Sequence, residues 1–313
     1  MTAQSLRTLA ARVSVVIPVF DRPHDVVSAV ASAASQDPPP GEIIVVDDGS
    51  AHPPASDAFV GSAVPVVLIR QSENQGAAAA RSRGIEAARG DWIAFLDSDD
   101  AWLPGKLQAQ LPLVKESAET LAAVTCCWCV EDARGRPSGT REPRPGNCPS
   151  DFVSGCWFAP GATTIVPRRA FETLGLFSAD LRRLEDYEWF VRFGLAGGRL
   201  DVARFVGAKV KAGRRAHSEA VTAAQHRILE RYRHRLDAGD RRRMRAYLAL
   251  ERAAAYRTEG NCSGLAIWLA LSLVLAPRLR IPLQSWWRDV DGQAQRTGGT
   301  GFPRSERSRR KAG

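Results

Sequence analysis

The first hundred residues alternate between short apolar runs and segments with helical periodicity, and this alternation restricts the fold more than any other feature of the chain. Runs rich in Val and Ile predict strands that are buried on both faces. The predicted strands span residues 13–20, 42–48, 64–71 and 91–97, and the predicted helices span 24–36 and 76–90. Strands that alternate with helices predict an α/β fold with a mostly parallel sheet.

Carboxylates follow three of these strands. They are Asp21, Asp47, Asp48, Asp97, Asp99 and Asp100. Ligands of such sheets bind beyond the carboxyl ends of the strands, so we expect these acids to converge on one rim. Acids at the end of a buried strand need positive charge nearby, and a divalent cation on Asp97 and Asp99 supplies it. An isolated DXD pattern is more often a solvated acidic loop, so this interpretation depends on further motifs.

Charge is distributed unevenly along the 313 residues, 44% of which are hydrophobic, enough for a sizeable core. Residues 1–198 hold 18 Lys and Arg against 24 Asp and Glu, whereas residues 199–313 hold 25 against 10. The change marks a candidate boundary. The basic half would face phosphates, anionic lipid or nucleic acid, although a solvated helix face is the commoner reason for runs of arginine.

The six cysteines show no spacing typical of a zinc site. Three of them lie in the run LAAVTCCWCV, which predicts a buried strand in which Cys acts as a small hydrophobic residue. Thiols of this kind fit a reducing cytosol. The N-terminus has no charged segment followed by a long apolar core and a cleavage site, so we expect a cytoplasmic protein, with peripheral contact to the inner face of the membrane as a further possibility.

Five motifs appear in order: VSVVIPVFDR, EIIVVDDGS, NQGAAAARSRGIEAARG, WIAFLDSDD and LEDYEWFVR. Together they resemble the family 2 glycosyltransferases with the GT-A fold, over residues 13 to about 222. The resemblance implies a Rossmann-like GT-A domain at 13–222, preceded by an extension at 1–12. We expect a helical C-terminal region at 223–292 and a basic, disordered tail at 293–313.

The resemblance implies a nucleotide-sugar site on the rim. Pro18, Phe20 and Asp21 would frame the base, although the family usually has Asn at position 21, and Asp48 would accept hydrogen bonds from the base. The remaining residues implied in donor binding are Asn74, Gly76, Arg81, Asp97, Ser98 and His217. Read without the resemblance, Asp48 is a turn residue and Arg81 a surface charge.

A divalent cation, Mg²⁺ or Mn²⁺, is also implied. Asp99 would be the direct ligand of the cation, which would bridge the two phosphates of the sugar nucleotide, while Asp97 would lie nearer the ribose. Hard oxygen ligands suit either ion. His217, with Arg215 beside it, would hold the diphosphate or complete the metal environment, yet a lone histidine is usually structural or solvent-facing.

Asp186 matches the acid of the ED motif and would take the proton of the acceptor hydroxyl, with Glu185 beside it. Local sequence alone also allows these acids to be the polar first turn of a helix. Trp157, Thr163 and Glu185 are possible acceptor-site residues, although a tryptophan here is as often a hydrophobic plug. Trp189 is predicted to be core.

The rear region predicts helices over 223–237, 241–257 and 264–276. The last is apolar, but thirteen residues at ~1.5 Å each give only about 20 Å, too short for a ~30 Å hydrocarbon core. We expect it to pack within a small helical domain. Docking on an anionic membrane is the alternative, because Arg278, Arg280, Trp286, Trp287 and Arg288 follow.

The sequence thus predicts an inverting glycosyltransferase that uses a nucleoside diphosphate sugar, most often a UDP-sugar. The acceptor would be a saccharide, a glycan or a lipid-linked acceptor of the cell envelope; nucleic acid is not an expected partner. A metal-dependent nucleotidyltransferase is an alternative, but it would normally carry a glycine-rich loop after the first strand. A catalytically silent nucleotide-sugar-binding protein is another, against which the presence of both acidic motifs argues.

Overall fold

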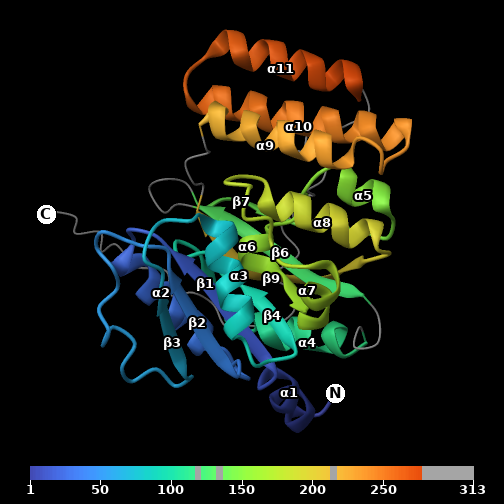
Figure 1. The fold of residues 1–313 in the computed structure, drawn as a ribbon. Helices are drawn as coiled ribbons and strands as arrows, with labels where there is room; N and C mark the ends of the chain where they lie inside the picture. Colours follow the sequence, from blue (N-terminus) through green and yellow to red (C-terminus); the bar gives the residue numbers. More distant parts are fainter. Residues whose placement is uncertain (117–120, 132–136, 212–216, 277–313) are drawn as a thin grey trace, which may run out of the picture.

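Nine strands form one mixed sheet in the computed structural model (Figure 1), which describes residues 1–116, 121–131, 137–211 and 217–276. Eight of the strands follow one another in the order β3-β2-β1-β4-β8-β6-β9-β5, and β7 pairs with β6. Arg215 and all residues after 276 lie outside the described ranges, and with them the predicted tail and the end of the helical region.

The first half of the sheet is parallel, as predicted. It consists of β1 (Val13–Val19), β2 (Glu42–Asp47), β3 (Val66–Arg70) and β4 (Trp92–Phe95). β1 is central and pairs in parallel with β2 and β4, and β3 pairs in parallel with β2. The Val and Ile side chains of β1 are buried on both faces, because helices α2 and α3 pack against this strand.

The second half of the sheet makes it mixed. Its strands are β5 (Ala101–Trp102), β6 (Ala122–Glu131), β7 (Pro137–Arg141), β8 (Ile165–Pro167) and β9 (Arg199–Lys211). β8 is antiparallel to β4 and to β6, whereas β9 is parallel to β6. The cysteine-rich run is the predicted buried strand: Cys126 and Cys127 lie in β6 and are 0% and 3% exposed.

Seven helices precede or connect the strands along the described chain. They are α1 (Ala3–Ala10), α2 (Pro23–Ala34), α3 (Ala77–Ala87), α4 (Lys106–Glu116), α5 (Pro149–Val153), α6 (Pro160–Thr163) and α7 (Arg168–Leu174). α1 belongs to the predicted N-terminal extension, yet Ala10 is fully buried and Leu6 and Leu9 pack against the main core. The extension is therefore part of the packed structure.

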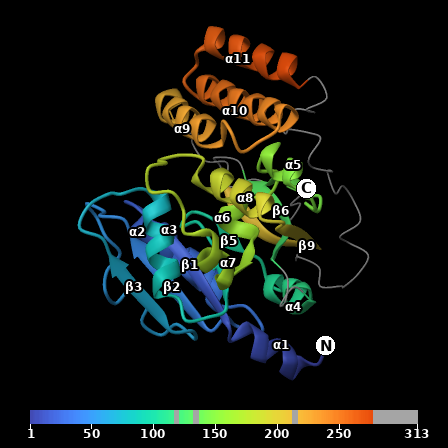
Figure 2. The ribbon, with the colours of Figure 1, turned by 45° about the vertical axis from the view of Figure 1, so that its right-hand side comes forward.

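Four further helices complete the described chain: α8 (Glu185–Leu195), α9 (Ser218–Tyr232), α10 (Ala238–Thr258) and α11 (Cys262–Leu275). In Figures 1 and 2, α9, α10 and α11 stack on one end of the sheet layer, with α8 between them and the strands. A second core joins Tyr187 and Val191 of α8 to Ile228 and Leu248. Within the described ranges, no helix has both the length and the apolar character needed to cross a bilayer.

Candidate active site

Three acidic loops leave the sheet at the same edge. In the register of the parallel strands, Val19 at the end of β1 lies opposite Asp47 at the end of β2, and β1 also pairs with β4 up to Phe95. Asp21, Asp48 and Asp97 therefore all follow strand ends on one rim, which is the arrangement that the alternating sequence predicts.

Asp21 fastens the loop after β1 to the loop after β2. Its Oδ1 accepts hydrogen bonds from the backbone N–H groups of Ala51 (2.8 Å) and His52 (3.2 Å). The residue has a φ of 50°, in the left-handed region that Asp and Asn tolerate better than most residues. This conformation explains why Asp can stand where the resemblance implies Asn. The neighbouring Phe20 is 44% exposed, so its ring is accessible, and Pro18 is half-buried.

Asp48 organises the loop that leads into α3. Its carboxylate is only 3% exposed and accepts hydrogen bonds from the backbone N–H groups of Gln75 and Gly76, both at 2.8 Å. Gly76 has a φ of 94°, a conformation that a side chain would strain. Asp48 is thus a loop-shaping residue as well as a candidate for base recognition, because each carboxylate oxygen has a second acceptor site.

Arg81 connects two motifs that are about a hundred residues apart in the sequence. Its Nη2 donates to Asp97 Oδ1 and its Nη1 donates to Glu185 Oε1, both at 2.7 Å. Burial alone would lower the pKa of Arg81, but the charges of Asp97, Glu185 and Asp186 raise it above its ordinary value. Arg81 is therefore a buried, permanently charged link between the DXD and ED motifs, and not the surface charge that helix position alone would suggest.

The DXD carboxylates lie close to one another and to arginine. Asp97 is half-buried beside Arg81, and Asp99 forms an ion pair with Arg22, at the start of α2. Ser98 between them is buried, at 5% exposure. Burial and, next, the charge of Asp97 raise the pKa of Asp100 to about 8. The cluster holds more negative charge than it can readily carry, which favours the binding of a cation.

A magnesium ion commonly takes one or two carboxylates from the protein and its other ligands from phosphates and water. Asp97 and Asp99 fit that donor set. The described residues contain no group of three or more His, Cys, Asp or Glu side chains arranged around one cation position. A fully protein-made metal cage is thus not what these residues form.

Asp186 lies at the start of α8, next to the Arg81–Glu185 pair. Asp186 is half-buried. The burial of Glu185 raises the pKa of Glu185, the negative charge of Asp186 raises it further, and the charge of Arg81 opposes both effects. The preceding residue, Leu184, has a φ of 61°, which is uncommon for a bulky residue and costs free energy. The strained Leu184 lies directly before the first turn of α8, whose Glu185 is joined through Arg81 to Asp97 of the DXD loop.

Three predicted residues are not part of this cluster. The indole of Trp157 is 1% exposed and packs against Phe152 and Phe158, so the hydrophobic-plug alternative is correct and the ring cannot stack on a sugar in this conformation. Thr163 is fully buried and its hydroxyl bonds to Thr125 and the Ala159 carbonyl, which makes it structural. Trp189 is core, as predicted.

His217 is the third predicted site residue that lies outside this cluster. Its side chain is 92% exposed, and its Nδ1 lies 3.6 Å from Glu259 at the end of α10. Among the described residues, no hydrogen bond or ion pair joins it to Asp97 or Asp99. The geometry gives it the solvent-facing position of a typical lone histidine, so its role in diphosphate binding stays a prediction.

Three rim residues escaped the sequence analysis. Arg22 pairs with Asp99, and Arg182 donates to the Asn74 side chain at 2.8 Å and to its carbonyl oxygen. A Cβ on Gly161, in α6, would overlap the Asp97 carboxylate, so a larger residue there would displace that side chain. The signal available was position: Arg22 follows Asp21 directly, and Arg182 stands just before the LED sequence.

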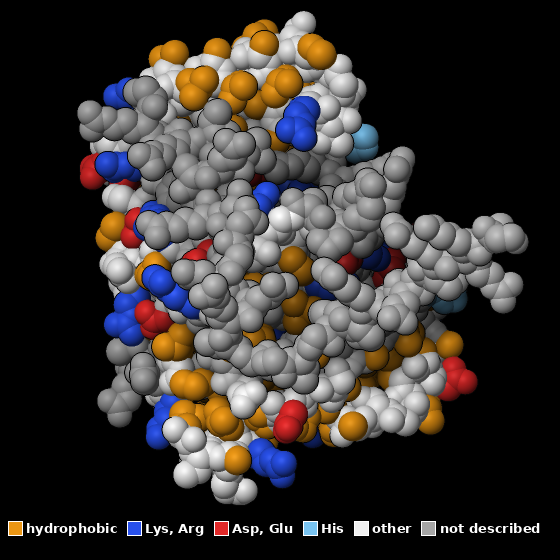
Figure 3. Space-filling view, turned by 180° about the vertical axis from the view of Figure 1, so that it is seen from behind, with side chains coloured by type: hydrophobic (Ala, Val, Ile, Leu, Met, Phe, Trp, Pro, Cys, Tyr) orange, Lys and Arg blue, Asp and Glu red, His pale blue; other side chains and the backbone are white. Residues whose placement is uncertain are grey.

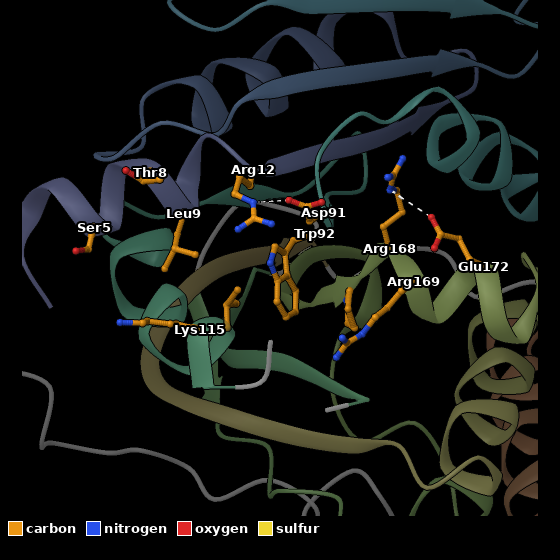
Figure 4. A pocket seen from close by; sticks show the side chains of 12 residues that line it. Ser5, Thr8, Leu9, Arg12, Asp91, Trp92, Lys115, Arg168, Arg169 and Glu172 are labelled. Carbon is orange, nitrogen blue, oxygen red and sulfur yellow. Dashed lines mark hydrogen bonds and ion pairs between the residues drawn. The ribbon is translucent and has the colours of Figure 1, made fainter. Parts of the chain in front are cut away.

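A cavity of about 570 Å³ lies at the opposite edge of the sheet (Figure 4). It is bordered by α1, α4, α7 and the start of β4. Its acids are already paired, Asp91 with Arg12 and Glu172 with Arg168. Since Asp91 directly precedes β4 and Asp97 follows its end, this cavity is separate from the acidic rim.

Comparison with known proteins identifies a matching family. The family described as glycosyl transferase family 2 matches residues 14–175. This stretch contains the strands β1 to β4 and the DXD loop, and ends before the ED motif at 185–186.

Related proteins of known sequence are bacterial glycosyltransferases. An uncharacterised one from Haemophilus influenzae is 27% identical over 180 residues, which cover 57% of this chain and 60% of that protein. The Escherichia coli enzyme WfgD, a UDP-Glc:α-D-GlcNAc-diphosphoundecaprenol β-1,3-glucosyltransferase, is 31% identical over 33% of this chain and 40% of its own. ExoO of Rhizobium meliloti, a succinoglycan biosynthesis protein, is 38% identical over 32% and 28%. The chain thus spans less than two thirds of these relatives.

Solved structures with the same fold include TarS of Staphylococcus aureus, residues 1–349. It superposes with a TM-score of 0.60 at 17% identity and covers 85% of this chain and 81% of that one. TarS has also been solved with UDP and with UDP-GlcNAc, and those structures superpose with TM-scores of 0.58 and 0.59. The GT-A-like architecture with C-terminal helices is thereby confirmed.

Proposed function

The chain belongs to glycosyltransferase family 2, and from this premise we propose that it transfers a sugar from a nucleoside diphosphate sugar to an acceptor hydroxyl, with inversion at the anomeric carbon. The observation that carries the proposal is the Arg81 bridge. It holds the DXD acid Asp97 and the ED-motif acid Glu185 within one hydrogen-bonded unit, with Asp186 alongside. Two halves of one reaction centre, donor and base, are thus adjacent.

The proposed donor is a UDP-sugar. Support comes from the TarS structures, which contain UDP and UDP-GlcNAc on the same fold. In this chain the exposed Phe20 would contact the base, and Asp48 would accept a hydrogen bond from its edge. Arg182 and Arg22 lie on the rim where the diphosphate would pass, and Arg is suited to phosphate because its donors form a planar fork.

Asp97 and Asp99 would hold a divalent cation, Mg²⁺ or Mn²⁺, which when bound supplies charge neutralisation to the leaving diphosphate. The protein side of that role is to present hard carboxylate oxygens in a fixed position. Arg81 fixes Asp97 from one side, and Gly161 leaves it room on the other. Arg22, paired with Asp99 in this structure, would turn toward phosphate when Asp99 binds the cation.

Asp186 is the proposed base. As the acceptor oxygen forms its bond to the anomeric carbon, the bond from that carbon to the diphosphate oxygen breaks, and the hydroxyl proton passes to the Asp186 carboxylate. General-base assistance of this kind contributes about 10²–10⁴ in rate. Glu185 keeps Arg81 in place, so it is a positioning residue and not the base.

The proposed acceptor is a saccharide or lipid-linked saccharide of the cell envelope. The names of the relatives support this class: WfgD acts on a diphosphoundecaprenol-linked GlcNAc, and ExoO and AmsB of Erwinia amylovora belong to succinoglycan and amylovoran synthesis. With Trp157 and Thr163 buried, the acceptor would be held by other residues near Asp186.

The test is a panel of nucleotide sugars, each with and without Mn²⁺, read by thermal shift. A ligand at 100 times its dissociation constant stabilises the folded state by about 2.7 kcal/mol. We expect a UDP-sugar to give the largest shift, and Asp99→Asn to remove its Mn²⁺-dependent part. Slow release of UDP from that sugar, lost in Asp186→Asn, supports the enzyme. If the UDP-sugar binds but no UDP is released with any acceptor tested, the chain is instead a catalytically silent binding protein.

A further inference from the structure

The last described helix, α11, exposes an apolar face. Its sequence, CSGLAIWLALSLVL, contains no charged residue. Ile267 and Val274 are 64% and 71% exposed, and Leu271 and Leu273 are 39% and 40% exposed. Four of the eleven large hydrophobic side chains that are exposed in the described residues thus lie on one helix of 14 residues. Figure 3 shows this concentration of hydrophobic side chains along one end of the molecule.

The opposite face of α11 packs on α10. The Ser272 hydroxyl donates to the Ala246 carbonyl at 2.8 Å, and the Trp268 ring lies 4.0 Å from the Arg252 guanidinium. Residues 264, 268 and 272 recur every four positions and face α10, whereas 267, 271 and 274, spaced by four and then three positions, are exposed. The exposed face is therefore a continuous stripe, produced by an apolar sequence that only one neighbouring helix covers.

Positive charge borders this stripe. The Arg242 guanidinium donates to the carbonyl oxygens of Val274 and Leu275 and so lies at the C-terminal end of α11. A cavity of about 440 Å³ between α9 and α10 is lined by Arg233, Arg241 and Arg245, with Glu230 as its one acid. Arg241 and Arg245 are one helical turn apart on α10, so both present their charge on one side.

An apolar stripe with arginine beside it is the composition of helices that lie in the interface of a bilayer. Anionic headgroups would neutralise the arginines while the apolar side chains enter the headgroup–acyl boundary. A second copy of this chain fits less well. Residues 199–313 carry 25 Lys and Arg against 10 Asp and Glu, so two copies that met through this region would repel each other. Charge complementarity therefore selects an anionic lipid surface as the occupant.

We propose that the exposed face of α11, formed by Ile267, Leu271 and Val274, docks on an anionic lipid surface, with Arg242 and the arginines of the α9–α10 cavity contacting the headgroups. The helix lies parallel to the surface, since it is too short to cross it. The inference depends on the exposed side chains and not on the proposed reaction, so it stands or falls by lipid binding alone.

The test is flotation of the full-length protein with two kinds of vesicle, phosphatidylcholine alone and an equal mixture of phosphatidylcholine and phosphatidylglycerol. We expect the protein to float with the mixed vesicles. Ile267→Glu/Val274→Glu should lower the bound fraction at least about tenfold, because two apolar side chains no longer leave water. The matched control is Val60→Glu: Val60 is 83% exposed but lies in the loop between β2 and β3, and its substitution should change nothing.

A second pair of variants tests the charge. Arg241→Gln/Arg245→Gln should lower binding to the mixed vesicles by about thirtyfold, with no effect on phosphatidylcholine alone. If the glutamate pair lowers the melting temperature, Ile267→Gln/Val274→Gln replaces it. Failure of the wild type to float, or equal flotation of the wild type and Ile267→Glu/Val274→Glu, overturns the proposal. So does a dimer that this variant abolishes while no lipid binding is seen, which would make a second copy the occupant.

Discussion

Helix α8 carries two buried glutamates one turn apart, Glu185 and Glu188, and their surroundings differ. Glu185 faces the rim of the sheet, where it shares Arg81 with Asp97 and lies beside Asp186. Glu188 faces α9 and is 0% exposed. Both belong to clusters of arginine and carboxylate, so composition alone does not separate the two sites.

The Glu188 cluster is complete. One carboxylate oxygen accepts from the Tyr232 hydroxyl at 2.8 Å and the other from the Ser178 hydroxyl at 2.9 Å. Arg192 and Arg231 each lie 3.1 Å from it. Burial and the Glu188 charge raise the pKa of Tyr232, which keeps its hydroxyl protonated as a donor. Every partner is matched, and the cluster joins α8 to α9.

Within the described residues, the rim cluster carries more acids than bases. Asp97, Asp99, Asp100, Glu185 and Asp186 outnumber Arg22, Arg81 and Lys211, and the pKa values of Asp100 and Glu185 are raised by burial and by their acidic neighbours. The difference teaches how to separate the two kinds of site. A saturated cluster supports the fold, whereas one with surplus charge and raised pKa values is suited to a ligand.

The largest expected effect is on turnover. Asp186→Asn should lower the rate of UDP release or transfer by about 10²–10⁴, because the base is lost, while the melting temperature changes little. Asp57→Asn, on the exposed segment between β2 and β3, is the control and should leave the rate unchanged. A variant with full activity would place the base elsewhere and remove Asp186 from the reaction.

The two glutamates should respond in opposite ways to the same substitution. Glu188→Gln should lower the free energy of unfolding by about 3 kcal/mol, because two half-buried arginines lose their fully buried counter-charge. Glu185→Gln should not lower it at pH 7, since the raised pKa of Glu185 means that the fold disfavours its charged form. Urea denaturation of both variants measures the difference. Equal losses would show that both clusters are structural.

Lys106 extends the comparison to a buried charged group that forms no ion pair with a carboxylate of the described residues. It is fully buried, its Nζ donates to Gln110 at 2.6 Å, and it lies 4.0 Å from the centre of the Trp102 ring. Burial lowers its pKa from 10.5 to about 8, against the opposing effect of Cys126.

Between those two values the unfolded chain binds a proton that the folded chain does not. Stability should therefore rise with pH from about 8 to 10.5, by on the order of 3 kcal/mol in total, and the gain should be absent below pH 8. Lys106→Met should remove this rise. Unfolding curves of wild type and variant across that pH range give the difference directly, and parallel curves would contradict the lowered pKa.

The smallest expected effect concerns Arg182. Arg182→Ala should weaken donor binding about tenfold, which corresponds to ~1.4 kcal/mol, because the side chain both holds Asn74 and adds positive charge to the rim. Arg204→Ala is the matched control, since Arg204 is 82% exposed and pairs with Glu142 away from the rim. Titration of the best nucleotide sugar by calorimetry measures both. Equal affinity in wild type and Arg182→Ala would restrict Arg182 to shaping the loop.

Much of the first half of the fold follows from local sequence. The four parallel strands lie within a few residues of the predicted ranges, because β-branched runs buried on both faces have few other structures open to them. The acidic rim follows as well, since parallel strands that end in Asp must deliver those acids to one edge. The strands β5, β7 and β9 were not predicted. β5 has only two residues, β7 lies in a segment without a readable period, and β9 is a strand of 13 residues that the sequence analysis missed.

The motifs by themselves indicated which residues to propose for donor binding and for the base, because acids at strand ends and at the start of a helix recur at fixed places along the chain. Only the tertiary structure decided that Arg81 joins them, that Trp157 is a core side chain, that Arg22 and Arg182 stand on the rim, and that one face of α11 is left uncovered. The physical reason is range. Hydrophobic period and strand ends are local properties, whereas burial and charge pairing depend on contacts between residues that can be more than 100 positions apart in the chain.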